Sequence, residues 1–201
     1  SAKNRHSQTA VHAVLRSYAP QAHKHPDAPE IVQRLIEAGA PLLGTELHFP
    51  IYRRDLQMVS LLIAPGCPVD LPLSKNEEYG PKKGDTPLAT LLRFNNFDLA
   101  GGSFDYEVTD PARLELCSLL LRHGANPNQP VAKGITPLRL ILPKTHDPFN
   151  LQLAKLLVEA GANPHSVPPG SKDPSVADLA VERGLTEFVE LFASVANDGS
   201  H

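Results

Sequence analysis

One short sequence motif occurs twice in the chain. Residues 120–127 read Leu-Leu-Arg-His-Gly-Ala-Asn-Pro, and residues 156–164 read Leu-Leu-Val-Glu-Ala-Gly-Ala-Asn-Pro. Self-similarity at a spacing of a few tens of residues is typical of a solenoid, in which every unit packs against its neighbours. This feature therefore constrains both the fold class and the places where helices begin and end.

The segment between the two phrases predicts a pair of helices. Thr136 suits a helix N-cap, and Pro137 suits the first helical position, where no N–H is needed. Gly161 suits the left-handed position past the end of the second helix. The residues expected to face the core at helical spacing are Leu138, Leu140 and Ile141 in the first helix, and Leu153, Ala154, Leu157 and Val158 in the second. One such pair cannot bury its own apolar face, so stacked neighbours are required.

The motifs at the start of each pair resemble those of the ankyrin repeat, which reads Thr-Pro-Leu-His, an apolar pair and then Gly-Ala. Residues 45–48 read Thr-Glu-Leu-His, residues 86–88 read Thr-Pro-Leu, and residues 9–12 give a variant with His12. The resemblance implies an all-α solenoid of stacked helix-turn-helix units with hairpin-like fingers, in which His12 and His48 are structural. It implies one domain over 1–201, with repeats at about 7–40, 41–69, 70–127, 128–164 and 165–195, the first and last degenerate, and a disordered tail at 196–201.

The repeats differ in length from the roughly 33 residues of the family. Three have extra residues, and all three excesses fall between the first and second helix, at about 19–29, 95–111 and 144–150. The finger between Gly39 and Thr45 is nearly deleted, whereas the finger at 71–85 is long. Loops of this length in a compact fold are usually functional or disordered.

Composition argues against several classes of partner. The net charge is −3, there is no Trp, and aromatic residues make up 5%, so we expect no binding of nucleic acid. The sequence contains no apolar run of about 20 residues, so we expect no membrane span. Cys67 and Cys117 fall on core positions, which favours buried thiols over a disulfide. We expect a monomer in the cytoplasm, and because the sequence begins at Ser1 an exported or periplasmic location stays open.

Chemical motifs are sparse. There is no Cys-x-x-Cys, phosphate-loop or Gly-x-Ser-x-Gly pattern, so we expect no enzyme, cofactor or metal site. His23 and His25 lie near Asp27, which leaves metal binding as a minor alternative to a polar loop. The carboxylates of the insertion at 94–111 leave catalysis as a third hypothesis.

The resemblance implies a non-catalytic protein–protein interaction module, which binds another protein through its concave face, fingers and long inter-helix loops. The alternative is a dedicated inhibitor or immunity-type protein that blocks one enzyme or toxin, since unequal insertions along one edge suit a single shaped partner. Arg and Tyr are enriched in interface hot spots, although for any single residue of this kind a solvated charged face is the more common explanation. The candidate partner-binding residues are Tyr52, Arg53, Tyr79, Lys82, Lys83, Arg93, Phe94, Phe97, Tyr106, Arg139 and Lys144.

Overall fold

The computed structural model describes residues 9–18, 26–76, 81–93, 111–143, 148–167 and 173–198. The chain divides into two compact units, residues 1–91 (unit 1) and residues 92–201 (unit 2). Within the described residues, both units are built from helices and turns without a strand. The predicted all-α fold class is therefore confirmed.

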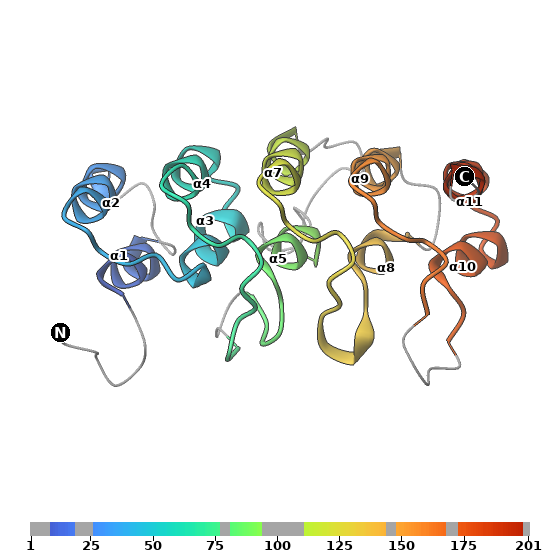
Figure 1. Ribbon diagram of the computed structural model, residues 1–201, viewed down its shortest axis with the longest axis horizontal. Helices are drawn as coiled ribbons and strands as arrows, with labels where there is room; N and C mark the ends of the chain where they lie inside the picture. The colour runs from blue at the N-terminus through green and yellow to red at the C-terminus, as the bar shows by residue number, and fades with distance from the viewer. Residues whose placement is uncertain are drawn as a thin grey trace, which may run out of the picture. The chain divides into compact units, whose positions relative to one another are not determined.

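Unit 1 contains two complete helix pairs. Their elements are α1 (Ala10–Tyr18), α2 (Ala28–Glu37), the short 3-10 turn η2 (Thr45–Leu47), α3 (His48–Tyr52) and α4 (Leu56–Ile63). Figure 1 shows α1 beneath α2 and α3 beneath α4, so the first helix of each pair forms an inner layer and the second an outer layer. Helix α5 (Pro87–Arg93) begins in unit 1 and crosses the boundary between the units.

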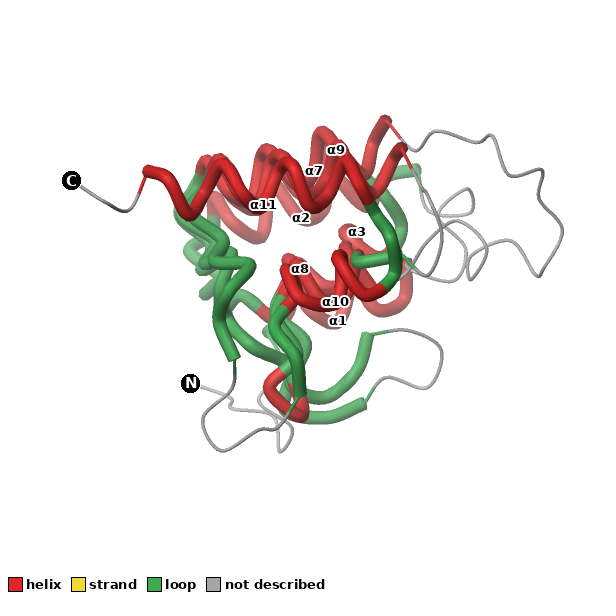
Figure 2. The backbone as a smooth tube through the Cα atoms, turned by 90° about the vertical axis from the view of Figure 1, so that its right-hand side faces the viewer, coloured by secondary structure: helices red, strands yellow, loops and turns green. Residues whose placement is uncertain are grey.

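Unit 2 repeats the same arrangement. Its elements are α7 (Pro111–Arg122), the 3-10 turn η3 (Ala132–Gly134), α8 (Pro137–Ile141), α9 (Pro148–Glu159), α10 (Val176–Glu182) and α11 (Thr186–Asp198). Figure 2 shows α7, α9 and α11 stacked in one layer, with α8 and α10 in a second layer beside it. Helix α11 runs to Asp198 and so passes the predicted boundary at 195.

Hydroxyl side chains begin the inner helices α1, α5, α8 and α10. The Oγ1 atoms of Thr9, Thr86 and Thr136 each accept a hydrogen bond from the amide three residues further on, at 3.0, 3.1 and 3.4 Å. Ser175 and Asp178 form a reciprocal capping box at the start of α10, and the bonds from Ser175 lower the pKa of the Asp178 carboxyl. The predicted N-cap at Thr136 is confirmed, and the same chemistry recurs along the chain.

The outer helix α9 ends as the sequence predicts. Gly161 has a φ of 91°, in the left-handed region. Its amide donates to the carbonyl of Val158, and the next amide donates to the carbonyl of Leu157, both at 2.9 Å. These two bonds are those of a Schellman motif, in which a residue without Cβ avoids backbone strain.

The core follows the predicted helical stripes. Leu153, Ala154 and Leu157 are fully buried in unit 2, as are Leu138 and Ile141 to within 2%. The other two residues expected to face the core, Leu140 and Val158, are half-buried.

The three insertions lie between the inner and outer helix of a pair, as predicted. All three end earlier than predicted, because α2 begins at Ala28, α7 at Pro111 and α9 at Pro148. Proline at the start of a helix has no N–H to leave unsatisfied, which lets these helices take up the last residues of each insertion. The remaining residues of the insertions, with His23 and His25, lie largely outside the described ranges.

Candidate functional site

The structure describes six of the predicted partner-binding residues. In unit 1, Arg53, Lys82 and Lys83 are exposed and Tyr52 is half-buried at the end of α3. In unit 2, Arg93 and Arg139 are half-buried. Five further candidates, Tyr79, Phe94, Phe97, Tyr106 and Lys144, lie outside the described residues.

The long finger of unit 1 is a paired loop between α4 and α5. The amide of Leu73 donates to the carbonyl of Asp85 at 3.0 Å, and the amide of Gly84 donates back to the carbonyl of Leu73 at 2.8 Å. The side chains of Leu73 and Asp85 are both buried at this base. The two arms are therefore fixed where they leave the helices, although the described residues of the finger form no helix or strand.

Two side-chain acceptors hold the backbone of the lysines on this finger. Asp85 Oδ2 accepts from the amide of Lys82 at 3.1 Å, and Asn76 Oδ1 accepts from the amide of Lys83 at 2.8 Å. Asn76 thus ties the outgoing arm of the finger to the returning arm. The lysine side chains stay exposed, as does that of Lys75. No ion pair joins any of these three ammonium groups to another residue in the described part of the chain.

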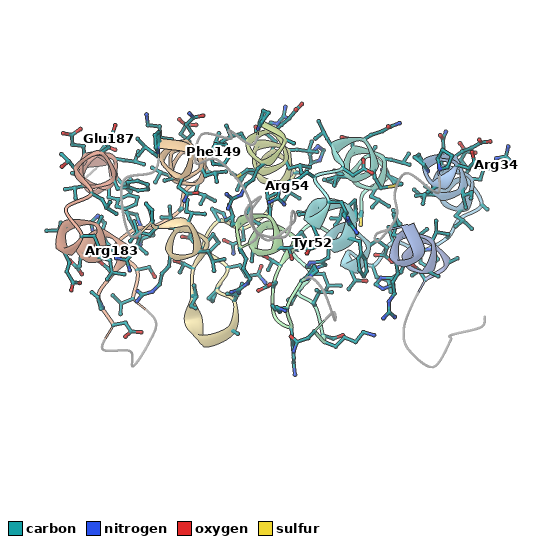
Figure 3. The ribbon with its side chains drawn as sticks, turned by 180° about the vertical axis from the view of Figure 1, so that it is seen from behind. Arg34, Tyr52, Arg54, Phe149, Arg183 and Glu187 are labelled. Atoms are coloured by element: carbon teal, nitrogen blue, oxygen red, sulfur yellow. The ribbon has the colours of Figure 1, made fainter. Side chains whose placement is uncertain are left out.

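Three arginines, unlike these lysines, donate hydrogen bonds to backbone carbonyls of the same unit. Arg54 Nη1 donates to the carbonyl of Ile51 at 3.0 Å, and Arg113 Nη2 donates to the carbonyl of Leu92 at 2.5 Å. Arg183, labelled in Figure 3, donates to two carbonyls just past the end of α8, at 3.2 and 3.0 Å. Each guanidinium satisfies acceptors at the C-terminal end of an inner helix, where a cation is also favoured by the helix dipole.

Arg139 has a similar structural contact. Its Nη1 donates to the carbonyl of Pro174 at 2.8 Å, which joins α8 to the loop that leads into α10. The sequence predicts Arg139 as a partner-binding residue, and that role stays a prediction. The structure adds that part of its hydrogen-bonding capacity is used inside the protein.

Buried polar groups connect the helix pairs of unit 1. Glu46 is fully buried, and its carboxylate accepts from Thr9 Oγ1 at 2.6 Å and from the amide of Leu43 at 3.0 Å. His48 is also fully buried, with Nδ1 2.8 Å from Thr90 Oγ1 and Nε2 3.1 Å from the carbonyl of Leu71. Burial lowers the pKa of His48 from 6.5 to about 4.

His48 therefore has the structural role that the resemblance implies. It joins the inner helix α3 to α5 and to the base of the long finger. His12 is buried too, and its ring packs edge-on against Phe49 with the ring centres 5.5 Å apart.

A single amide side chain joins the repeated phrases in unit 2. Asn128 Nδ2 donates to the carbonyl of Gly161 at 2.8 Å, and Asn128 Oδ1 accepts from the amide of Asn163 at 2.7 Å. Asn126 and Asn163 each accept from the amide two residues on, at 2.9 Å. The Gly-Ala-Asn-Pro phrase thus recurs because the same turn is needed at both places.

The described residues offer little for catalysis. Cys67 and Cys117 are buried and free of disulfide, as predicted. Burial raises the pKa of both thiols to about 12, so neither forms the thiolate that a nucleophile needs. Among the described residues no three histidine, cysteine or carboxylate side chains gather as metal ligands. None of the helices described is both long enough and apolar enough to cross a bilayer.

Comparison with known proteins supports the fold. No family model matches the chain, and no curated protein matches it. A crystal structure of an ankyrin repeat domain from Acinetobacter baumannii AYE is similar, with 23% sequence identity and a TM-score of 0.54. The match covers 80% of this chain and 68% of that one. With its repeated pairs of inner and outer helices, the chain has the ankyrin-repeat fold.

Proposed function

We propose that this chain is a non-catalytic module that binds another protein, with the long finger of unit 1 as a principal contact. The ankyrin-repeat fold is typical of such modules, but fold alone does not establish function. The proposal therefore depends on one observation about the finger itself.

That observation is the combination of a fixed backbone with exposed cations. The amides of Lys82 and Lys83 are hydrogen-bonded to Asp85 and Asn76, while both ammonium groups are exposed. A loop that is ordered before binding loses less conformational entropy when a partner docks. Exposed charges then set the orientation and the rate of association.

The test is a capture experiment followed by titration. The wild-type chain is immobilised beside the variant Lys82→Glu/Lys83→Glu, and proteins bound from the native extract are identified by mass spectrometry. The control variant Arg122→Glu/Lys155→Glu reverses the same number of exposed charges on the outer helices α7 and α9. A stoichiometric partner should then be titrated with each purified chain.

We expect the finger variant to bind that partner about tenfold more weakly, because two favourable charge contacts become repulsive. The control variant should bind like the wild type. Equal affinity for all three chains would remove the finger from the interface.

A second candidate is a dedicated inhibitor that covers the active site of one enzyme. The observation that favours it is the placement of the insertions, which all lie between inner and outer helices. In unit 2, the guanidinium carbon (Cζ) of Arg113, in the first turn of α7, lies 5.7 Å from the centre of the Phe149 ring, in the first turn of α9. The insertions that precede these turns therefore end side by side, which suits one shaped partner. Loss of the captured enzyme's turnover on adding the chain would support this role, and unchanged turnover would exclude it.

A further inference from the structure

We propose that unit 1 carries a composite docking surface for an acidic protein segment that contains an apolar anchor residue. The apolar half of this surface is Leu43 and Leu71, and the basic half is Lys75, Lys82 and Lys83. The inference rests on the proposed function and adds the chemical class of the partner.

The apolar half consists of two leucines that are distant in sequence and lie on segments that pack against each other. Leu43 is 42% exposed and Leu71 is 40% exposed. Gly44, the residue after Leu43, packs against the second segment, because a Cβ built on it would lie 2.7 Å from the carbonyl oxygen of Pro68 and 2.9 Å from Leu71 Cβ. Neighbouring exposed apolar side chains form a patch, which a single exposed leucine would not.

The short first finger explains why these leucines are exposed. Figure 1 shows that the connection from α2 to α3 stays near the inner helices, whereas the connection from α4 to α5 extends well beyond them. The first connection runs over residues 38–44 to η2, which leads directly into α3, and the second runs over residues 64–86. In a stack of repeats each finger lies beside the next, so a nearly deleted finger leaves the base of the following one uncovered.

The basic half belongs to the same uncovered finger. Lys75 follows Leu71 on the outgoing arm, and Asn76 joins that arm to Lys83 on the returning arm. All three lysines are exposed and form no ion pair with a described residue. Arg54, Arg113 and Arg183 instead donate to backbone carbonyls inside the protein.

The exposed lysines beside the exposed leucines indicate the chemistry of the partner. Lysine ammonium groups are compact point charges that attract carboxylates without requiring a fixed planar geometry. A partner segment that places carboxylates on the lysines and one apolar side chain on the leucines satisfies both halves at once. Apolar contact supplies affinity by removing the leucines from water, and the charges supply orientation.

The test uses a defined probe. A fluorescein-labelled peptide of 15 residues built from Glu-Leu-Glu units is titrated with the full chain and followed by fluorescence anisotropy. Two comparison peptides replace either Glu by Gln or Leu by Ser, and an oligonucleotide of equal charge serves as a generic polyanion. Each titration is run at low and at moderate salt, because exposed charge contacts weaken as salt rises.

We expect the acidic apolar peptide to bind best, and Lys82→Glu/Lys83→Glu to weaken it about tenfold. Leu43→Asn/Leu71→Asn should weaken it about fivefold, because the apolar contact is lost. The matched controls are Arg122→Glu/Lys155→Glu and the exposed apolar change Val181→Asn, a side chain that is 64% exposed. These controls should leave the affinity unchanged.

A further variant gives an independent check. Glu77 and Glu78 lie in the same finger sequence, outside the described residues, and their change to Gln should strengthen binding of the acidic peptide. Equal binding of the oligonucleotide, or equal losses in the control variants, would overturn the inference.

The same variants are then tested on the partner captured from the extract. A partner that binds all of them like the wild type would overturn the docking surface and leave the binding module in place. The absence of any stoichiometric partner would instead overturn the proposed function.

Discussion

Acidification should destabilise unit 1 through His48. The folded chain holds the pKa of His48 at about 4, against 6.5 for an exposed histidine, because the ring is buried. Asp85 favours the charged ring and His12 disfavours it, but both effects are smaller than that of burial. Since the unfolded chain binds the proton more readily, stability is complete above pH 6.5 and falls as the pH drops toward 4.

The size of this effect follows from the two pKa values. A shift of one unit corresponds to about 1.4 kcal/mol, so the full loss of unfolding free energy is about 3 kcal/mol. Roughly 2 kcal/mol of this loss should occur between pH 7 and pH 5, where only the unfolded state becomes protonated. Urea unfolding followed by circular dichroism at 222 nm measures it at each pH.

The variant His48→Gln isolates this group from all other titrating groups. Glutamine is neutral and can still donate toward the carbonyl of Leu71, so the variant removes the titration with part of the hydrogen bonding kept. The stability difference between wild type and variant should shrink by roughly 2 kcal/mol from pH 7 to pH 5. A difference that is the same at both pH values would refute the assignment of the acid sensitivity to His48.

Three further perturbations test the scaffold. Asn128→Ala removes both bonds to the following loop and should lower the unfolding free energy by about 2 kcal/mol in a urea titration. Ser175→Ala removes the cap of α10 and should cost about 1 kcal/mol, read as a fall in the melting temperature of the chain. Cys67 and Cys117 should react with a thiol reagent at neutral pH only as fast as the chain opens, since their thiols are buried and protonated. Rapid labelling of the folded chain would contradict their burial.

Features determined by a single residue type could be predicted from the sequence. A threonine hydroxyl caps the helix that follows it at Thr9, Thr86 and Thr136, and a glycine in the left-handed region follows α9. The cap at Thr136 and the left-handed Gly161 are both found where expected. The burial of Cys67 and Cys117 followed in the same way from their places in the repeat.

Features that depend on a partner far along the chain could not be predicted. Glu46 follows Thr45 in the same way that Pro87 follows Thr86. Its burial depends on a hydrogen bond from Thr9, 37 residues earlier. Asn128 bonds to groups 33 and 35 residues further on. No local pattern distinguishes these side chains from solvated ones, because the information lies in the packing of one repeat on the next.

The candidate site shows the same limit. The exposure of Lys82 and Lys83 was predictable from a long polar finger. Their hydrogen-bonded backbone was not, because it depends on Asp85 being buried and on Asn76 reaching across the loop. The exposed Leu71 could have been found from one signal, the near deletion of the preceding finger, which uncovers its neighbour.

Gly44 connects the stability of unit 1 with the proposed docking surface. Its φ is 94°, and an added Cβ would meet the backbone of Pro68 at 2.7 Å, so Gly44→Ala must shift residues 43–44 relative to Pro68 and Leu71. The variant should lose about 2 kcal/mol of stability from backbone strain and this collision. Gly39→Ala is the matched control, because its φ is 81° but no atom lies within 4 Å of the added Cβ. It should lose only about 1 kcal/mol.

If the two leucines act as one patch, folded Gly44→Ala should bind the acidic apolar peptide as weakly as Leu43→Asn/Leu71→Asn, and folded Gly39→Ala should bind it normally. Normal binding by both glycine variants would show that the spacing of the leucines does not matter, and the composite surface would lose its apolar half.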